Sequence, residues 1–214
     1  MSTYPRPERL HFADEVRLDW LGPLLDAYHR IDEGVQEGVG REEAQGRRLA
    51  CAKGCSACCR SHLTIPVYPL ELMGLYWYCG ERLEGLLRTR LAAQLAAFVP
   101  GAACPFLVDG GCAVHPMRPI ACRQFNVFDR ACAEGEDAFH SRRGDVLTPL
   151  RRYADEAYDL MLPFYGIKDR KERRAAVKSG RIHALARVLQ GLDWGRLAQR
   201  MGRVEAEPPG SAGV

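Results

Sequence analysis

The stretch CAKGCSACC at residues 51–59 decides how this chain is interpreted, because it places four cysteines within nine positions. Gaps of two or three residues let several sulfurs turn around one ion at a metal–sulfur distance of about 2.3 Å. Gly54 permits a tight reversal directly before Cys55. Cys58 and Cys59 are adjacent, and neighbouring side chains usually point in different directions, so both rarely serve one tetrahedral ion. The stretch therefore leaves three alternatives: a disulfide framework, a redox switch or a metal site.

A second group of cysteines follows about fifty residues later, in a segment dense in Gly and Pro. It comprises Cys104, Cys112 and Cys122 within PGAACPFLVDGGCAVHPMRPIACRQF. Pro105 fixes the chain direction after the first of them, and Gly110 with Gly111 predicts a turn before the second. So irregular a segment needs something to order it, and a bound metal would do so. Arg118 and Arg123 are expected to offset the negative charge of clustered thiolates.

These motifs resemble the YkgJ-like cysteine-cluster family, the CxxCxxCC domain that is described as zinc- or iron-chelating. The resemblance rests on CAKGCSACC, on CPFL followed by GGC, and on HPMRPIACR, in that order, over roughly residues 51–128. It implies seven metal or cluster ligands: Cys51, Cys55, Cys58, Cys59, Cys104, Cys112 and Cys122. A related cysteine cluster occurs in flagellin lysine N-methylases, where an iron–sulfur cluster is implied, so the domain can accompany an enzyme.

Three other residues have alternative interpretations. His115 is either a metal ligand or a turn residue in a His-Pro step, and Cys132 is either an auxiliary ligand or lies outside the site. Cys79, in GLYWYCGERL, is expected to be a buried apolar residue of a helix.

The number of cysteines bears on the cofactor. The chain has nine, an odd count, and its charged N-terminus contains no apolar signal segment, which favours a cytoplasmic protein with reduced thiols. Structural disulfides are therefore the least favoured alternative. Seven thiolates exceed what one four-coordinate zinc requires, whereas an iron–sulfur cubane takes four. The pattern favours an iron–sulfur cluster or iron, with zinc as the alternative.

The apolar periodicity predicts a mainly α fold, in which helices flank a loop-rich, metal-organised cysteine-cluster core with little or no strand. We expect a helical segment over 1–50, the metal-binding core over 51–132, a C-terminal helical segment packed on the core over 133–203, and a disordered tail over 204–214.

Individual elements follow from local signals. Gly34, Gly38 and Gly40 weaken the first helix and indicate a linker into the cysteine region. SHLTIPVYP predicts a short strand, and Pro69 predicts the start of a helix that continues to about residue 98 with a break near Gly80. The C-terminal part predicts three further helices over 146–163, 168–190 and 193–202.

Charge and motifs narrow the function. The net charge is +3, and the basic run at 168–181 is interleaved with acids and lacks aromatic residues, so nucleic acid is not an expected partner. No run of about 18 apolar residues suggests a membrane span. The chain lacks the glycine-rich strand–helix turn of an S-adenosylmethionine Rossmann site.

The favoured function is a metal-binding protein with a redox, sensing or metal-handling role. One alternative is a metal-dependent modifying enzyme such as a protein lysine N-methyltransferase, with no catalytic residue assigned. The other is an interaction module with a structural zinc site and a protein partner.

Overall fold

Helix α1 (Leu21–Ala44) is the longest element of the computed structural model, which describes residues 3–206. The other α-helices are α2 (Ala57–Ser61), α3 (Pro69–Glu81), α4 (Gly85–Ala96), α5 (Ile120–Gln124), α6 (Ala138–Ser141), α7 (Arg151–Met161), α8 (Arg170–Lys178) and α9 (Gly195–Ala206). The strands are β1 (Pro66–Val67), β2 (Leu107–Val108), β3 (Gly111–Cys112) and β4 (Arg187–Val188), and short 3₁₀ turns span Ala13–Val16, His115–Met117, Arg143–Asp145, Leu162–Tyr165, Arg181–Leu185 and Leu189–Gly191. The prediction of a mainly α fold with little strand is confirmed.

The glycines of α1 are packing positions rather than the start of a linker. A Cβ on Gly34 would lie 2.7 Å from Tyr153 Cβ, and one on Gly38 would lie 3.0 Å from Leu147 Cδ1. The two glycines therefore let α7 and the segment before it approach the α1 backbone closely. The predicted linker was wrong, because a helix tolerates the modest cost of glycine where close packing repays it.

Helix α3 begins at Pro69, as predicted, and ends before a short break that leads into α4. The carboxylate of Glu71 accepts the N–H of Tyr68 at 2.9 Å and the N–H of Ile120 at 2.7 Å. It thus caps α3 and also fixes the first residue of α5. This buried link sets the position of the helix that carries Cys122.

Two small antiparallel sheets connect distant parts of the chain. β1 pairs with β4, with Pro66 opposite Val188, and β2 pairs with β3, with Leu107 opposite Cys112. The predicted helix over 168–190 was wrong beyond Lys178, because the chain there turns and supplies the partner of β1.

At the C-terminal end of the described residues, α9 extends through residues 204–206, and the remaining predicted tail, 207–214, lies outside the described residues.

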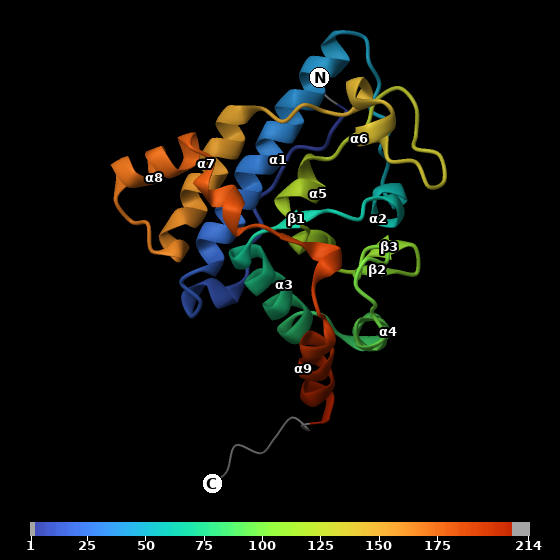
Figure 1. Ribbon diagram of the computed structural model, residues 1–214, viewed down its shortest axis with the longest axis vertical. Helices are drawn as coiled ribbons and strands as arrows, with labels where there is room; N and C mark the ends of the chain where they lie inside the picture. Colours follow the sequence, from blue (N-terminus) through green and yellow to red (C-terminus); the bar gives the residue numbers. More distant parts are fainter. Residues whose placement is uncertain (1–2, 207–214) are drawn as a thin grey trace.

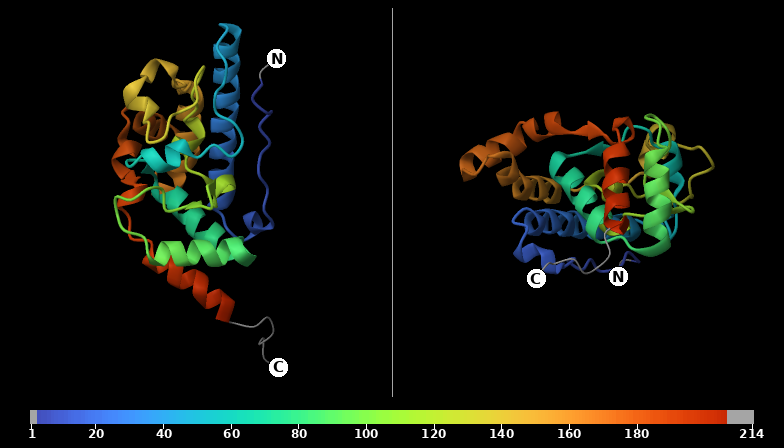
Figure 2. Two further views of the ribbon diagram at one scale, coloured as in Figure 1. Left: turned by 90° about the vertical axis from the view of Figure 1, so that its right-hand side faces the viewer. Right: turned by 90° about the horizontal axis from the view of Figure 1, so that it is seen from below.

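Figure 1 shows α3 between two groups of elements, with α7 and α8 on one side and α2, β2, β3 and α4 on the other. Figure 2 shows that α9 lies at one end of the molecule beside α4. One hydrophobic core joins residues from the whole chain, including Leu25 of α1, Leu75 of α3, Met161 of α7 and Trp194 before α9. No helix within residues 3–206 combines the length and the apolar character needed to cross a membrane.

Candidate metal centre and the adjoining cavity

Three segments bring most of the predicted ligands together. Cys58 and Cys59 lie on α2, and Cys122 lies on α5. The N–H of Cys104 donates to the carbonyl of Cys59 at 2.8 Å, which fastens the loop before β2 to α2. The β2–β3 hairpin then returns Cys112 toward this point.

The spacing between Cys104 and Cys112 depends on the turn of this hairpin. Asp109 and Gly110 have φ angles of 50° and 78°, so these two residues form the turn, one position earlier than predicted. Two successive positive φ angles are typical of a tight two-residue hairpin turn, and glycine adopts the second without strain. In the resulting register Cys112 lies opposite Leu107, and Leu107 is three residues after Cys104.

The thiols form a connected set around Cys58. Interaction with the Cys59 thiol raises the pKa of Cys58, and interaction with the Cys104 thiol raises the pKa of Cys59. Electrostatic interactions join Cys58 to Cys112 and to Cys122. Five of the seven predicted ligands, Cys58, Cys59, Cys104, Cys112 and Cys122, are therefore linked in one network although they come from separate segments.

Cys51 and Cys55 lie at another side of Cys58. Cys51 interacts electrostatically with Cys55, Cys58 and Cys132, and its Sγ accepts the N–H of Val127 at 3.3 Å. Cys132 also interacts with Cys55 and Cys58. Cys58 is thus the common neighbour of a five-thiol group and of a second group formed by Cys51, Cys55 and Cys132.

Burial and mutual proximity disfavour ionisation of these thiols. The hydrogen bond with Cys59 and burial raise the pKa of Cys58 well above its ordinary value, and the hydrogen bond with Cys104 and burial raise the pKa of Cys59 to about 12. Burial, partly offset by the Val127 N–H, raises the pKa of Cys51 to about 11, and burial together with the neighbouring Cys58, Cys112 and Cys59 raises the pKa of Cys122 strongly. A nucleophilic cysteine requires the opposite shift, so these four thiols lack the activation of a cysteine nucleophile.

The cysteines suit a metal centre in type and number but not in their present positions. All nine cysteines are free thiols, and thiolates are preferred ligands of zinc and of iron–sulfur clusters. No three Cys, His, Asp or Glu side chains within residues 3–206 are placed to hold an ion as they stand. The donors therefore fit such a centre in type and number, and their sulfurs would have to draw together to reach metal-bond distances of about 2.3 Å.

The residues around the second motif have roles different from those expected. His115 is exposed, and its Nε2 contacts the Arg118 guanidinium, which commits that nitrogen to an arginine. Arg123 directs its guanidinium to Asp32 and to backbone carbonyls rather than to sulfur. Both arginines still act on the cluster, because their positive charges lower the pKa of Cys112 against the larger effect of burial. Cys79 is fully buried in α3, as predicted.

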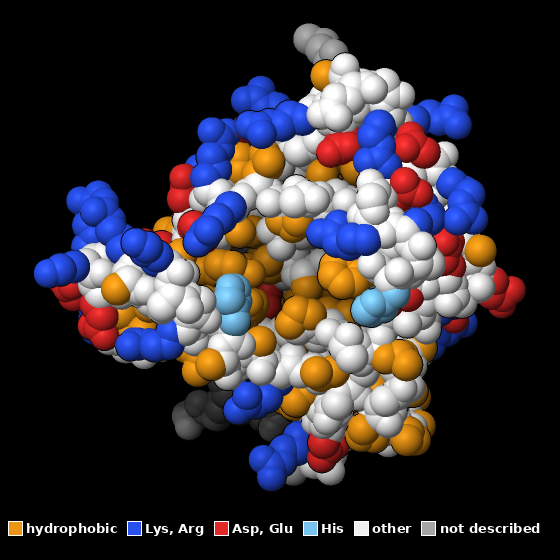
Figure 3. All heavy atoms as spheres, turned by 45° about the horizontal axis from the view of Figure 1, so that its top comes forward, with side chains coloured by type: hydrophobic (Ala, Val, Ile, Leu, Met, Phe, Trp, Pro, Cys, Tyr) orange, Lys and Arg blue, Asp and Glu red, His pale blue; other side chains and the backbone are white. Residues whose placement is uncertain are grey.

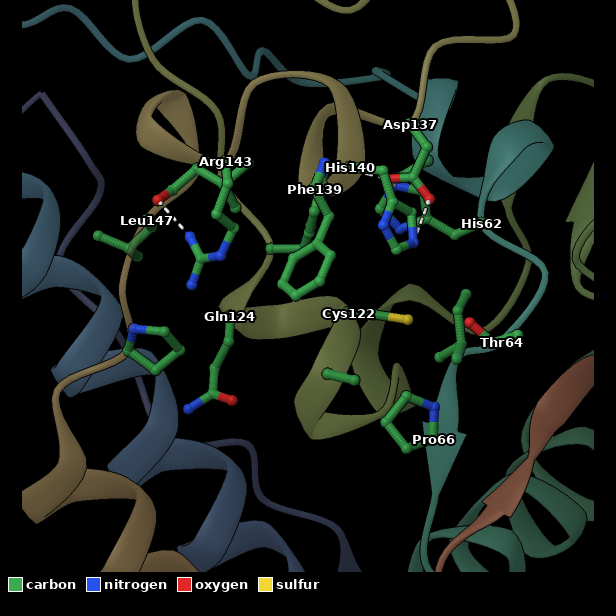
Figure 4. Close-up of a pocket in the computed structure, with 16 residues that line it drawn as sticks. His62, Thr64, Pro66, Cys122, Gln124, Asp137, Phe139, His140, Arg143 and Leu147 are labelled. Atoms are coloured by element: carbon green, nitrogen blue, oxygen red, sulfur yellow. Dashed lines mark hydrogen bonds and ion pairs between the residues drawn. The ribbon is translucent and has the colours of Figure 1, made fainter.

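A cavity of about 390 Å³ adjoins the thiol cluster, and Cys58 and Cys122 form part of its wall. Figure 3 shows a hollow with hydrophobic side chains in its depth and Lys, Arg and His side chains at its rim. The close-up in Figure 4 shows Phe139 above Cys122, with Arg143 and Gln124 on one side and His62 with Asp137 on the other. Volumes of this size are typical of small-molecule sites.

The His62 side of the cavity is held by Asp137. His62 Nε2 lies 3.2 Å from Asp137 Oδ1, and the same oxygen accepts the N–H of Phe139 at 2.9 Å, which caps α6. The ring of His62 meets the edge of Phe125 with centroids 4.3 Å apart, and burial lowers the pKa of His62.

Apart from Cys58 and Cys122, the residues that line the cavity were not predicted from the sequence. One available signal was the position of His62, four residues after Cys58, which places both on one face of a helical turn. The residues from 137 to 147 carry no comparable local signal.

Comparison of the chain with models of protein families, with curated proteins and with solved structures finds no match.

Proposed function

We propose that this chain binds a metal centre through its clustered cysteines, with an iron–sulfur cluster or iron favoured over zinc, and acts in redox chemistry, sensing or metal handling. The observation that supports the proposal is the position of Cys58. Its thiol neighbours those of Cys59, Cys112 and Cys122, which come from three separate segments. The proposed ligands are the seven cysteines named from the sequence, and the YkgJ-like resemblance forms part of the same proposal.

The number of neighbouring thiols favours a cluster over one zinc ion. The group around Cys58 supplies five sulfurs before Cys51 and Cys55 are counted, whereas a structural zinc site takes four ligands in all. A cubane cluster bound by four cysteines leaves the remaining thiols for a second metal or for exchange. When bound, the centre would supply electron transfer or a Lewis acid, and the protein would supply the thiolates and the N–H donors around them.

Metal analysis of protein purified without oxygen tests this proposal. We expect iron with acid-labile sulfide and absorption in the visible range. A colourless protein with stoichiometric zinc would replace the cluster by the zinc alternative, and a protein that binds neither metal would refute the proposal.

Matched substitutions test the ligand set. Cys58→Ala and Cys122→Ala should each lose most of the bound metal, because both remove sulfurs from the five-thiol group. Cys79→Ala is the control, since Cys79 is a fully buried residue of α3 and is not among the proposed ligands. Equal metal loss from all three variants would show that metal content follows stability rather than ligation.

A second candidate function is a metal-dependent modifying enzyme, and the cavity beside Cys58 and Cys122 is the observation that favours it. A substrate seated there would lie against the proposed metal centre. Assay of methyl transfer from S-adenosylmethionine to a lysine-bearing protein tests the methyltransferase form of this alternative. Activity that is lost in Cys122→Ala and kept in Cys79→Ala would support it.

A further inference from the structure

The cavity wall carries a guanidinium that has no carboxylate partner among residues 3–206. Arg143 Nη1 donates to the carbonyl of Val146 at 3.0 Å, and the guanidinium lies over the Phe139 ring, 4.9 Å from its centroid. Within the described part of the chain, that carbonyl is the only hydrogen-bond acceptor of this guanidinium, and no carboxylate pairs with it. Its remaining N–H groups are therefore available at the cavity wall.

A second polar group lies on the same side. Figure 4 shows the Gln124 side chain below Arg143, with its amide directed away from the guanidinium. The amide makes no hydrogen bond with any residue from 3 to 206, and Gln124 lines the cavity. The free donors of the Arg143 guanidinium suit a carboxylate, which accepts bidentate and charge-assisted hydrogen bonds.

The polar groups on the opposite side of the cavity are paired with one another. Asp137, which lines that side, is engaged with His62 and with the backbone N–H of Phe139. Between the two polar sides the wall is apolar, with Phe125, Phe139, Ile65 and Leu147 among the lining residues. The carboxylate of Asp137 thus has hydrogen-bond donors, whereas the guanidinium of Arg143 has no carboxylate partner among residues 3–206.

We propose that this cavity binds an organic monocarboxylate with a compact apolar body, the carboxylate at Arg143 and the body between Phe139 and the wall formed by Cys58 and Cys122. The volume of about 390 Å³ suits a body of about ten non-hydrogen atoms. Binding does not require the metal centre, although the two cysteines belong to both sites. Where the metal is present, the apolar body lies next to it, which gives the centre either a sensed ligand or a substrate.

Titration calorimetry with 3-phenylpropionate and hexanoate tests the proposal on the full-length protein. The controls are 3-phenylpropan-1-ol, which keeps the body and removes the charge, and 3-phenylpropylamine, which reverses the charge. We expect saturable binding of at least one acid, at least about tenfold tighter than the alcohol and the amine, in proportion to the loss of charge-assisted hydrogen bonds. Tighter binding of the amine, equal binding of acid and alcohol, or no saturable binding of either acid would overturn the proposal.

Two variants locate the site. Arg143→Gln should remove the preference for the acid, while Arg170→Gln, an exposed arginine at the start of α8, should leave the affinity unchanged. An acid affinity that survives Arg143→Gln would refute the assignment. Metal content measured on the same samples keeps the two proposals separate, since Arg143→Gln should retain the metal of the wild type whether or not the acid binds.

Discussion

Arg123 provides the sharpest test of how the second cysteine motif is held. Its side chain is 4% exposed and its Nη1 lies 2.6 Å from Asp32 Oδ2. Its Nε donates to the carbonyl of Arg118 at 2.9 Å, its Nη2 donates to the carbonyl of Pro116, and the guanidinium lies 4.0 Å from the centroid of the Tyr28 ring. One residue thus joins α1 to the turn that precedes Cys122.

The change Arg123→Met keeps the length and the apolar contact with Tyr28 while it removes every donor. The carboxylate of Asp32, which is 19% exposed, then loses its cation. Its Oδ1 has no hydrogen-bond partner among the described residues, so neither oxygen would be paired. The carbonyls of Arg118 and Pro116 also lose their donor. Removing one member of a buried ion pair costs about 3–5 kcal/mol. Because water reaches Asp32 in part, we expect a loss of about 3 kcal/mol in the free energy of unfolding.

Urea unfolding followed by circular dichroism measures this loss, with two companion variants. Arg123→Lys keeps the charge without the planar fork, so it should lose less stability and still fold. Arg90→Met is the control, because Arg90 forms an exposed ion pair with Asp109 that is expected to contribute less than about 1 kcal/mol. A loss below about 1 kcal/mol in Arg123→Met, at unchanged dependence on urea, would refute the view that Arg123 anchors this turn.

Two further predictions concern packing and pH. Gly34→Ala should lower the free energy of unfolding, measured with urea, by about 1–2 kcal/mol, because the new Cβ lies 2.7 Å from Tyr153 Cβ. Gly202→Ala, where the new Cβ has no atom within 4 Å, should raise it by up to about 1 kcal/mol. A stabilising Gly34→Ala would contradict the packing role of Gly34. Glu71 is fully buried, and burial raises the pKa of its carboxyl from 4.5 to about 7. At this carboxyl the folded state then binds more protons than the unfolded state, so the contribution of Glu71 to stability is fully present below about pH 4.5, and about 3 kcal/mol of it is lost as pH rises through 7, at about 1.36 kcal/mol per pH unit. Glu71→Gln should remove this slope, and an unchanged slope in pH-dependent unfolding would show that another group causes it.

Local signals identified the features that depend on neighbouring residues. Pro69 at the start of α3 and the Gly110-Gly111 pair before Cys112 act over a few positions, so the sequence predicts a helix start there and a turn within one position of the observed one. The set of clustered cysteines follows in the same way from spacing and from the resemblance. Convergence of Cys104 and Cys122 on α2 was predicted only through that resemblance.

Features that depend on distant partners were not predictable. Gly34 lies within a helix, where the absence of a side chain leaves space for Tyr153, far along the chain. A single sequence does not distinguish this glycine from one that ends a helix. β4 exists because β1 supplies its partner, with Val67 opposite Arg187. Arg143 and Gln124 line one cavity although they belong to different elements, so no periodicity connects them.

The segments that carry the thiols are held by contacts other than sulfur. The loop before β2 is fixed by the Cys104 N–H on the carbonyl of Cys59, α5 is fixed by Glu71 and Arg123, and the chain before Cys51 is fixed by the N–H of Ala50 on the carbonyl of Val127. These bonds belong to a fold whose hydrophobic core runs from α1 to α9. A zinc finger differs in that its few residues fold only with the metal. Here the metal centre would draw together thiols that the fold already holds near one another, so its removal should loosen α2 and the β2–β3 hairpin while the helical core stays intact.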